Sequence, residues 1–319
     1  MGKPTALILG CNYTQIPYVR AARGLGFRVV GVDRNPDAPG RAEVDAFYPV
    51  GYTDFEGLEK VVEKENLSAG DKIFTAAAHL AYEGAARLAE LIGIPFPPVA
   101  AIDTGLDKTR FYALLGEQGI AVPSTQLFDE RRSHILDPRQ TYFLKSDYGK
   151  SPTYCYRIEN GILPSLPKEY DAFFRRDFLL QEEVLGDHYR VNIYGDQAAI
   201  FLKLTDHAAV PLRILGPGHL HVLAKLRKVM RSLALTDWLV KFDLIVTEQH
   251  WYVIDLGLDP PMRLRQLCEY LGIDFPMAYA RFYLLGERAA LPAWVDICRP
   301  LLIEGSPEKG FVFTDLGEK

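Results

Sequence analysis

The sequence has few cysteines and no pair of them spaced as a metal or redox motif. Its 319 residues include four, scattered without a CxxC: Cys11, Cys155, Cys268 and Cys298. Zinc sites and redox pairs are therefore disfavoured, and we expect free thiols in a reducing compartment. The chain also has no apolar run as long as a membrane span or a signal-peptide core, so we expect a cytoplasmic protein.

An excess of basic residues is missing as well. Lys and Arg number 36 against 41 Asp and Glu, which gives a formal net charge of −5. Non-specific binding to nucleic acid or anionic membrane requires the opposite balance, so we expect neither as a partner. Hydrophobic residues make up 48% and charged residues 24%, an ordinary balance for a globular chain with two or three subdomains.

The first segment has the order of a dinucleotide-binding unit but lacks its glycines. An apolar strand is followed by Gly10, a helix, and a second strand at 29–32 that runs into Asp33. Asn12 and Gln15 stand where the second and third glycines belong. Side chains there obstruct the approach of a pyrophosphate, so an NAD-linked oxidoreductase is the less favoured alternative.

Strands and helices alternate over the first hundred residues and then give way to another pattern. Alternation of this length predicts a parallel sheet covered by helices, and hence the α/β class. The next region opens with a helix that Asp107 caps and Gly119 ends. The segments that follow predict paired antiparallel strands, which are typical of an α+β region.

One predicted hairpin gathers charged residues on a single face. If residues 248–250 form its turn, Asp243 lies opposite Asp255 and Lys241 opposite Gly257. The other face is apolar and should belong to the core: Phe242, Leu244, Val246, Tyr252, Ile254, Leu256 and Leu258. Two facing aspartates repel, and a hard cation such as Mg²⁺ would offset the repulsion. A solvated polar face is the alternative interpretation.

Further polar residues stand at the ends of predicted elements. Lys108 opens a helix, Lys145 ends a strand before the loop "SDYGKSPT", and Gln181 follows an apolar strand. Taken singly, such residues are most often solvated surface. Taken in order with the hairpin, they resemble the ATP-grasp superfamily through about Gly286. The stretches "NPDAPGRAEVDAFYPVGYTD" and "DKTRFYALLGEQGIAVP" are the most similar to that family.

The resemblance implies a fold and a domain division. Residues 1–103 would form the Rossmann-like pre-ATP-grasp domain of the carbamoyl-phosphate-synthase type, which binds no dinucleotide and packs beside the active site. A two-lobed α+β ATP-grasp domain would follow, with its small lobe at 104–180 and its large lobe at 181–319. The tail from Leu291 extends past the family pattern. Its apolar segments predict two short strands that pack on the body or pair with a second subunit.

The resemblance also implies roles for single residues. The ATP-binding set would be Lys108 and Lys145 at the phosphates, Gln181, Glu182 and Val184 at the adenine, and His188 at the ribose. Asp243 and Asp255 would hold Mg²⁺. Lys241 would face the transferred phosphoryl group, and Arg263 or Arg265 would take the part of the family's motif arginine.

Some positions depart from the family pattern. Asp255 stands where glutamate is usual, and Gly257 replaces the asparagine that supplies a second metal oxygen, with Asp259 two residues further on. The loop after Lys145 has a single glycine in "DYGKSPTYC", fewer than is common. Because of these departures, a second interpretation stays open. In it the protein is a degenerate member of the family, a regulatory or scaffolding module that binds ATP or ADP and carries out no ligase chemistry.

ATP-grasp ligases pass the γ-phosphoryl group of ATP to a carboxylate, and an amine or another nucleophile attacks the acyl phosphate. The resemblance therefore implies an ADP-forming ligase that uses ATP and Mg²⁺ on small-molecule carboxylate and amine substrates. Such phosphoryl transfer depends on alignment and charge neutralisation. A homodimer is an open alternative to a monomer.

Three histidines and an arginine cluster in "DHAAVPLRILGPGHLH". His207, His219 and His221 could bind zinc, but no further ligand has a suitable spacing, which favours a pocket-lining loop or plain surface. Arg213 either binds a substrate carboxylate or lies on the surface.

Overall fold

Four parallel strands form the first sheet, in the order β3-β2-β1-β4. Their bounds are β1 (Thr5–Leu9), β2 (Arg28–Val32), β3 (Ala46–Tyr48) and β4 (Lys72–Thr75). Helix α1 (Ile16–Gly24) connects β1 to β2, a 3₁₀ turn at Pro39–Glu43 lies between β2 and β3, helix α2 (Phe55–Lys64) connects β3 to β4, and helix α3 (His79–Ile92) follows β4. All of β1 is buried, as its apolar run predicts for a central parallel strand.

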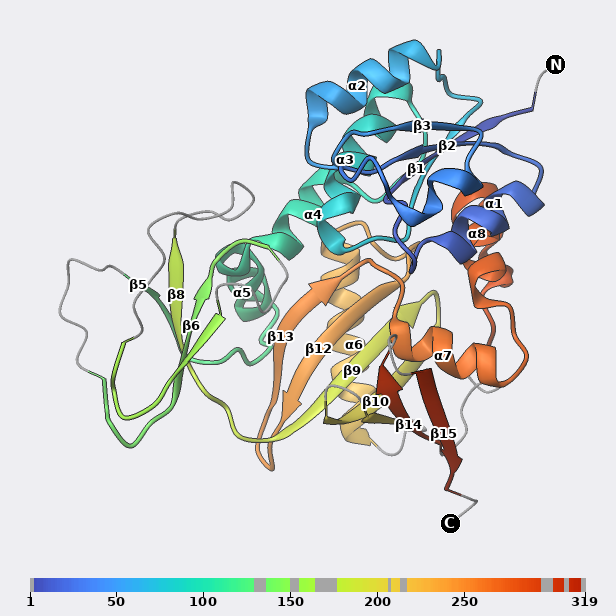
Figure 1. The fold of residues 1–319 in the computed structure, drawn as a ribbon. Helices are drawn as coiled ribbons and strands as arrows, with labels where there is room; N and C mark the ends of the chain where they lie inside the picture. The colour runs from blue at the N-terminus through green and yellow to red at the C-terminus, as the bar shows by residue number, and fades with distance from the viewer. Residues whose placement is uncertain are drawn as a thin grey trace.

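This structure is a computed structural model (Figure 1). It describes residues 3–128, 136–149, 155–163, 177–205, 208–212, 217–293, 301–306 and 310–316. Within those ranges, no helix has the length and hydropathy needed to cross a bilayer. The cytoplasmic location stays a prediction.

Two helices lead from the first sheet to the rest of the chain, α4 (Val99–Leu106) and α5 (Lys108–Glu117). The sequence predicts α5 correctly, since the Asp107 side chain accepts a hydrogen bond from the Arg110 backbone as an N-cap. Helix α4 was not predicted. The prolines before it suggest a break, but Pro98 stands at its N-cap, where a missing N–H is tolerated.

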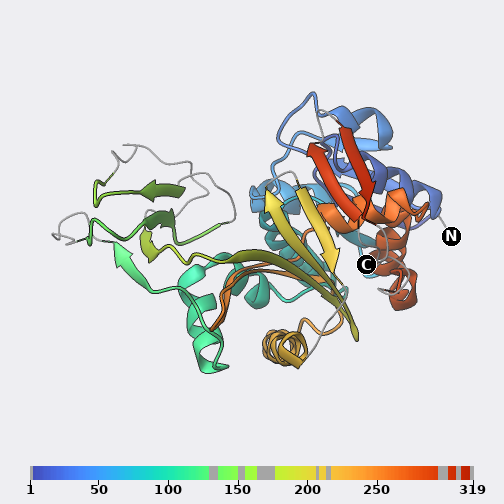
Figure 2. The ribbon, with the colours of Figure 1, turned by 90° about the horizontal axis from the view of Figure 1, so that it is seen from below.

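A small antiparallel sheet projects to one side of the molecule, in the order β5-β8-β6-β7 (Figures 1 and 2). Its strands are β5 (Thr125–Phe128), β6 (Tyr142–Ser146), β7 (Cys155–Ile158) and β8 (Phe178–Glu182). Its own core is built from Tyr142, Leu144, Ile158, Phe178 and Leu180. The small sheet is thus a separate packing unit joined to the body by α5 and the β8–β9 connection.

The large sheet has seven strands, in the order β13-β12-β9-β10-β11-β14-β15. They are β9 (Asp187–Tyr194), β10 (Gln197–Thr205), β11 (Ala208–Leu212), β12 (Val240–Val246), β13 (Trp251–Gly257), β14 (Leu301–Ser306) and β15 (Gly310–Asp315). Helix α6 (Pro217–Ser232) lies on one face of it (Figure 2). Because β14 pairs with β11, the tail extends the sheet of its own chain. The tail was predicted either to pack on the body or to pair with a second subunit. The structure contains the first arrangement.

Helices α7 (Met262–Tyr270) and α8 (Phe275–Leu285) return the chain to the first sheet, before a 3₁₀ turn at Arg288–Ala290. The rings of Tyr18 in α1 and Tyr279 in α8 meet edge to face, with centroids 5.5 Å apart. The hydroxyls of Tyr82 and Tyr279 form a buried hydrogen bond. The first sheet and the large sheet therefore share one core, although the domain limits at 103 and 180 stay predictions.

The β12–β13 hairpin has the predicted register at its charged end. Asp243 pairs with Asp255 and Lys241 with Gly257. The predicted turn is wrong, because Val246 rather than Thr247 pairs with Trp251, and residues 247–250 form the turn.

The difference in register is taken up by a bulge that skips Ile254. A bulge adds one residue to one strand. The side chains of that strand between the bulge and the turn therefore point to the face opposite to the one predicted without a bulge. Val253 is accordingly fully buried, whereas Tyr252 and Ile254, which were predicted for the core, are only partly buried. Phe242, Leu244, Leu256 and Leu258 lie in the core as predicted.

Candidate active site

The turn after β1 is closed by its own side chains. Gln15, only 7% exposed, accepts a hydrogen bond from the Asn12 backbone at 3.0 Å and donates one to the Ala76 carbonyl at 3.4 Å. The Asp33 carboxylate accepts from the Cys11 backbone N–H at 2.9 Å. The groups that a dinucleotide would contact thus bond to one another, and the candidate site lies elsewhere.

Two of the predicted ligand-binding residues meet in the small sheet. Lys145 of β6 and Gln181 of β8 project from adjacent strands, and Lys145 Nζ donates to Gln181 Oε1 at 2.7 Å. Tyr112 of α5 contacts both: its hydroxyl oxygen lies 3.0 Å from Lys145 Nζ and 3.2 Å from Gln181 Nε2. Nothing in the sequence singles out Tyr112, because it lies on the apolar face of a helix.

Lys108 lies at the base of the loop that follows β6. Its Nζ donates to the Gly149 carbonyl at 2.6 Å, and its backbone N–H donates to the Asp147 carbonyl at 2.8 Å. Residues 150–154 of the predicted flap lie outside the described residues. Lys108 and Lys145 thus flank the same loop from α5 and β6.

The predicted adenine and ribose residues lie on the connection between the two antiparallel sheets. The Glu182 N–H donates to the Ser124 carbonyl at 2.9 Å, and its side chain is exposed. Val184 lies in the connection itself, and His188 lies near the start of β9, opposite Lys203. Their roles toward a nucleotide stay predictions.

The facing aspartates have an unpredicted cationic neighbour. Strand β9 runs beside β12 and places Arg190 opposite Asp243. The Arg190 guanidinium donates two hydrogen bonds to the Asp243 carboxylate, Nε to Oδ1 at 2.7 Å and Nη2 to Oδ2 at 2.9 Å. Asp243 is 7% exposed, so this pair is largely shielded from water. Part of the repulsion between Asp243 and Asp255 is therefore offset by a side chain of the protein.

Arg190 is the centre of a charged cluster. Burial lowers its pKa, but the negative charge of Asp243, its hydrogen bonds, and the charges of Asp259 and Asp255 outweigh that effect and raise it overall. The pKa of Arg263 changes in the opposite direction: burial, and then the positive charge of Arg190, lower it. The Arg190 side chain, 21% exposed, thus bonds directly to one carboxylate, that of Asp243, and is affected by the charges of two others.

Lys241 belongs to the same cluster. It is 6% exposed and forms an ion pair with Asp259, two residues beyond the end of the hairpin. A lysine buried to this degree needs a paired anion. The predicted catalytic lysine is therefore held at the charged end of the hairpin by an aspartate.

A cavity of about 280 Å³ separates this cluster from the closed turn of the first sheet. It is lined on one side by Gln15 and Ala76 and on the other by Arg190, Lys241 and Arg265, among others. Asp259, the partner of Lys241, lines it too, so the three cationic side chains outnumber one carboxylate there, a balance that favours a small anionic ligand.

The two arginines proposed for the motif role differ in position. Arg265 lines the cavity and donates to the Thr14 carbonyl at 3.3 Å. Arg263 donates to Gln266 Oε1 at 3.0 Å and lies over the ring of Phe311, 6.0 Å from its centroid. The structure therefore favours Arg265 for contact with a ligand in the cavity, and Arg263 for contact with the tail.

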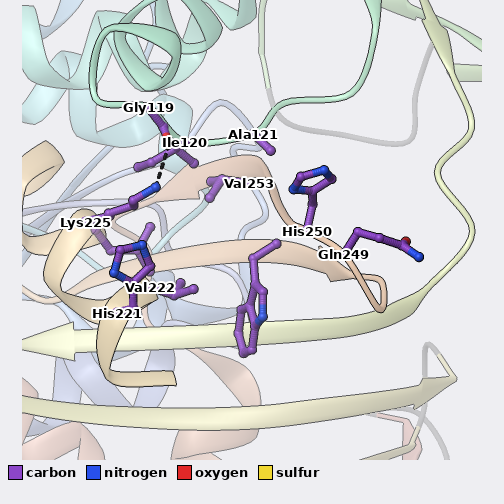
Figure 3. Close-up of a pocket in the computed structure, with 11 residues that line it drawn as sticks. Gly119, Ile120, Ala121, His221, Val222, Lys225, Gln249, His250 and Val253 are labelled. Atoms are coloured by element: carbon purple, nitrogen blue, oxygen red, sulfur yellow. Dashed lines mark hydrogen bonds between the residues drawn. The ribbon is translucent and has the colours of Figure 1, made fainter. Parts of the chain in front are cut away.

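A second pocket, of about 220 Å³, lies at the turn end of the hairpin, away from the charged cluster (Figure 3). His221 and Lys225 of α6 lie on the other side of it from His250, Trp251 also lines it, and Lys225 Nζ donates to the Gly119 carbonyl at 2.6 Å.

This pocket contains one of the three histidines considered for zinc, His221. His207, Arg213 and the side chain of His219 lie outside the described residues. Among the side chains that the structure describes, no three potential metal ligands of the His, Cys, Asp or Glu type form a group.

No protein-family model matches the sequence, and the curated protein sequences contain no match to it. Solved structures are similar to it over almost its whole length. The L-amino acid ligase from Bacillus licheniformis aligns with a TM-score of 0.66 and 15% identity, covering 95% of this chain and 79% of that one. The N5-carboxyaminoimidazole ribonucleotide synthetase from Thermotoga maritima aligns with a TM-score of 0.67 and 16% identity, covering 94% and 80%.

A third similar structure is the biotin carboxylase domain of the Hydrogenobacter thermophilus 2-oxoglutarate carboxylase, a dimer in complex with MgADP, ADP and bicarbonate. It aligns with a TM-score of 0.68 and 16% identity, covering 94% of this chain and 74% of that one. The parallel sheet followed by small and large antiparallel sheets is common to this chain and these enzymes, and the chain has the ATP-grasp fold.

Proposed function

We propose that this protein is an ATP-dependent, ADP-forming ligase that activates a small carboxylate as an acyl phosphate for attack by an amine or another nucleophile. The observation that supports it most is the charged end of the β12–β13 hairpin. Asp243 and Asp255 face each other there, and Lys241 stands beside a cavity with a cationic wall. The enzymes with the same fold include ligases and synthetases by name, and one was solved with MgADP.

ATP would lie between the small and large sheets. Lys108 and Lys145 would contact its phosphates, and the connection from Gln181 to Val184 would contact its adenine. The proximity of Lys145 and Gln181 supports this placement, since both side chains point to one face of the small sheet. Fixed cations neutralise the charge that develops on the transferred phosphoryl group.

Mg²⁺ fits the oxygen donors of Asp243 and Asp255. It is commonly held by one or two carboxylates, with substrate phosphates and water completing six ligands, so a third protein ligand is not required. When bound, it supplies positive charge between the phosphate oxygens. Gly257 has no side-chain oxygen. The protein would therefore supply fewer metal ligands than is usual in the family.

The carboxylate substrate would occupy the cavity beside the first sheet. Arg265 and Lys241 line that cavity and would orient the carboxylate toward the γ-phosphate. Arg190 lines it as well and adds a third positive charge. The closed walls on the Gln15 side would keep water from the acyl phosphate.

The test is the variant Asp243→Asn assayed for ADP release over a panel of carboxylates and amines. We expect carboxylate-dependent ADP release by the wild type and a loss of at least about 100-fold in the variant, the size typical of lost charge stabilisation in phosphoryl transfer. The exposed Asp196→Asn is the matched control and should keep full activity. Full activity of a folded Asp243→Asn would refute the metal assignment.

A second candidate function is a nucleotide-binding module without ligase chemistry. Two observations favour it: the Arg190 guanidinium already neutralises Asp243, and Gly257 removes one metal ligand. Titration calorimetry separates the two candidates. ATP binding that does not depend on Mg²⁺, with no ADP formed over the whole panel, would support the module. A homodimer stays an open expectation for either.

A further inference from the structure

The hydroxyl of Tyr112 bonds to groups from three different elements. It accepts from Lys145 Nζ of β6 at 3.0 Å and from Gln181 Nε2 of β8 at 3.2 Å. It donates to the Ile254 carbonyl of β13 at 3.1 Å. A tyrosine hydroxyl has one hydrogen and two lone pairs, so these three bonds use its whole capacity. The side chain is 7% exposed, and water has little access to compete.

These bonds fix the direction of the Lys145 ammonium. Of its three N–H groups, one points to Tyr112 and one to Gln181 Oε1 at 2.7 Å. Gln181 is itself held, because its Nε2 also donates to Thr125 Oγ1 at 2.8 Å. An ammonium group anchored at two corners keeps its third N–H in one direction, as pre-organised binding of a phosphate oxygen requires.

The third bond reaches the strand that carries a proposed metal ligand. Ile254 is the residue that the β12–β13 register skips, and Asp255 follows it directly. One hydroxyl therefore connects the small sheet, through Lys145 and Gln181, to the strand that holds Asp255. The Tyr112 side chain thereby links the proposed phosphate-binding lysine to the strand of that aspartate, beside the backbone bond from the Val253 N–H to the Ala121 carbonyl at 3.1 Å.

We propose that Tyr112 is a positioning residue, which orients Lys145 toward the phosphates of the nucleotide and holds the small sheet against β13. The inference rests on the proposed function, because it takes Lys145 as a phosphate ligand. Tyr112→Phe removes the hydroxyl and keeps the ring, so the core contacts of α5 are preserved. A matched control is Tyr194→Phe, another buried tyrosine whose hydroxyl donates to a backbone carbonyl, that of Pro292, at 2.6 Å.

The first measurement is the affinity for ADP and for adenosine by titration calorimetry. We expect Tyr112→Phe to weaken ADP binding about tenfold, the effect of one hydrogen bond to a charged group, and to weaken adenosine binding clearly less, because Gln181 keeps its hydrogen bond to Thr125. Tyr194→Phe should leave both affinities at their wild-type values. A purely structural role would weaken both ligands together, and that result would overturn the proposal.

The second measurement is a double-mutant cycle with Lys145→Met. If Tyr112 acts through the lysine, Tyr112→Phe has no further effect on ADP affinity in the Lys145→Met background. The same tenfold loss in both backgrounds would refute the positioning role. Wild-type protein that binds no ADP would refute the proposed function, whereas ADP binding that Tyr112→Phe leaves unchanged would refute this inference alone.

Discussion

Arg190 and Asp243 lie on neighbouring strands and share two hydrogen bonds, at 2.7 and 2.9 Å, although 53 positions separate them in the sequence. The negative charges of Asp259 and Asp255 also raise the pKa of Arg190. The guanidinium therefore already neutralises one of the two carboxylates that are proposed to hold a divalent cation.

Replacing Arg190 with methionine should destabilise the protein by about 3 kcal/mol, because it leaves the buried Asp243 carboxylate without the guanidinium that bonds to it. Millimolar Mg²⁺ should then raise the melting temperature of the variant more than that of the wild type. Both effects are measured by calorimetry with and without Mg²⁺. Arg281→Met, which removes a half-exposed ion pair with Glu287, is the control and should cost less than about 1 kcal/mol. An Arg190→Met protein as stable as wild type, or one that does not respond to Mg²⁺, would contradict this account.

Cys155 should report nucleotide binding. It is exposed and lies opposite Lys145 in the β6–β7 register, whereas Cys11 and Cys268 are fully buried. Iodoacetamide should label Cys155, and ADP should slow that labelling several-fold, as peptide mapping by mass spectrometry would show. Adenosine, which carries no phosphate, is the control ligand. Equal protection by adenosine and ADP would place the phosphates away from Lys145.

The buried thiols should stay unreactive as the pH rises. Burial, and secondarily the charge of Asp33, raises the pKa of Cys11 to about 12, and burial with the charge of Glu269 raises that of Cys268 to about 12. A raised pKa keeps the thiol almost entirely protonated at pH 9, and burial blocks access to it, so labelling at these two sites should stay negligible at pH 9 while that of Cys155 proceeds. Reaction of either at pH 9 in folded protein would contradict the predicted burial.

His79 should be required for stability although it lies outside the proposed ligand contacts. Its Nδ1 accepts from the Leu258 N–H at 3.1 Å, and its Nε2 lies 3.3 Å from the Ile102 carbonyl. His79→Phe removes both bonds inside the core and should cost about 1–3 kcal/mol in urea unfolding. The exposed His250→Phe should change the free energy of unfolding by less than about 0.5 kcal/mol. Equal stabilities of the two variants would show that these bonds contribute nothing.

Gly186 should resist substitution because of a close backbone approach. A Cβ at this position would lie 2.3 Å from the Val246 carbonyl oxygen, so β9 or β12 would have to move. Gly186→Ala should cost about 1–3 kcal/mol, measured by thermal unfolding. Gly116→Ala in α5 has open space around it and should instead stabilise the helix by about 0.5 kcal/mol. The opposite signs of the two effects are the critical result.

Local patterns predicted most of the fold. The apolar run at β1 and the Asp107 cap of α5 are properties of neighbouring residues, and both predictions are confirmed. The hairpin prediction is confirmed at Asp243 and Asp255 and wrong at the turn, because a bulge at Ile254 compensates for a turn of four residues. A longer turn and a bulge that compensate for each other cannot be recognised from the alternation of apolar and polar residues in a single sequence.

The missed residues of the candidate site all depend on pairing between distant segments. Arg190 stands in an unremarkable strand sequence, and its importance follows only from the placement of β9 beside β12. Tyr112 has the spacing of a core residue on α5, and its hydroxyl finds partners on three other strands. The order of strands in a sheet is a tertiary property that local periodicity does not encode.

The pairing of the tail with β11 has a consequence for the region around Arg263. Phe313 of β15 stacks on Tyr270 of α7 with ring centroids 4.7 Å apart, and Phe311 lies against the Arg263 guanidinium. A shortened protein ending near residue 300 would expose the α7 surface and hydrate that arginine. Fusions or truncations at this end, where β14 and β15 lie next to α7 (Figure 1), would therefore alter the surroundings of Arg263.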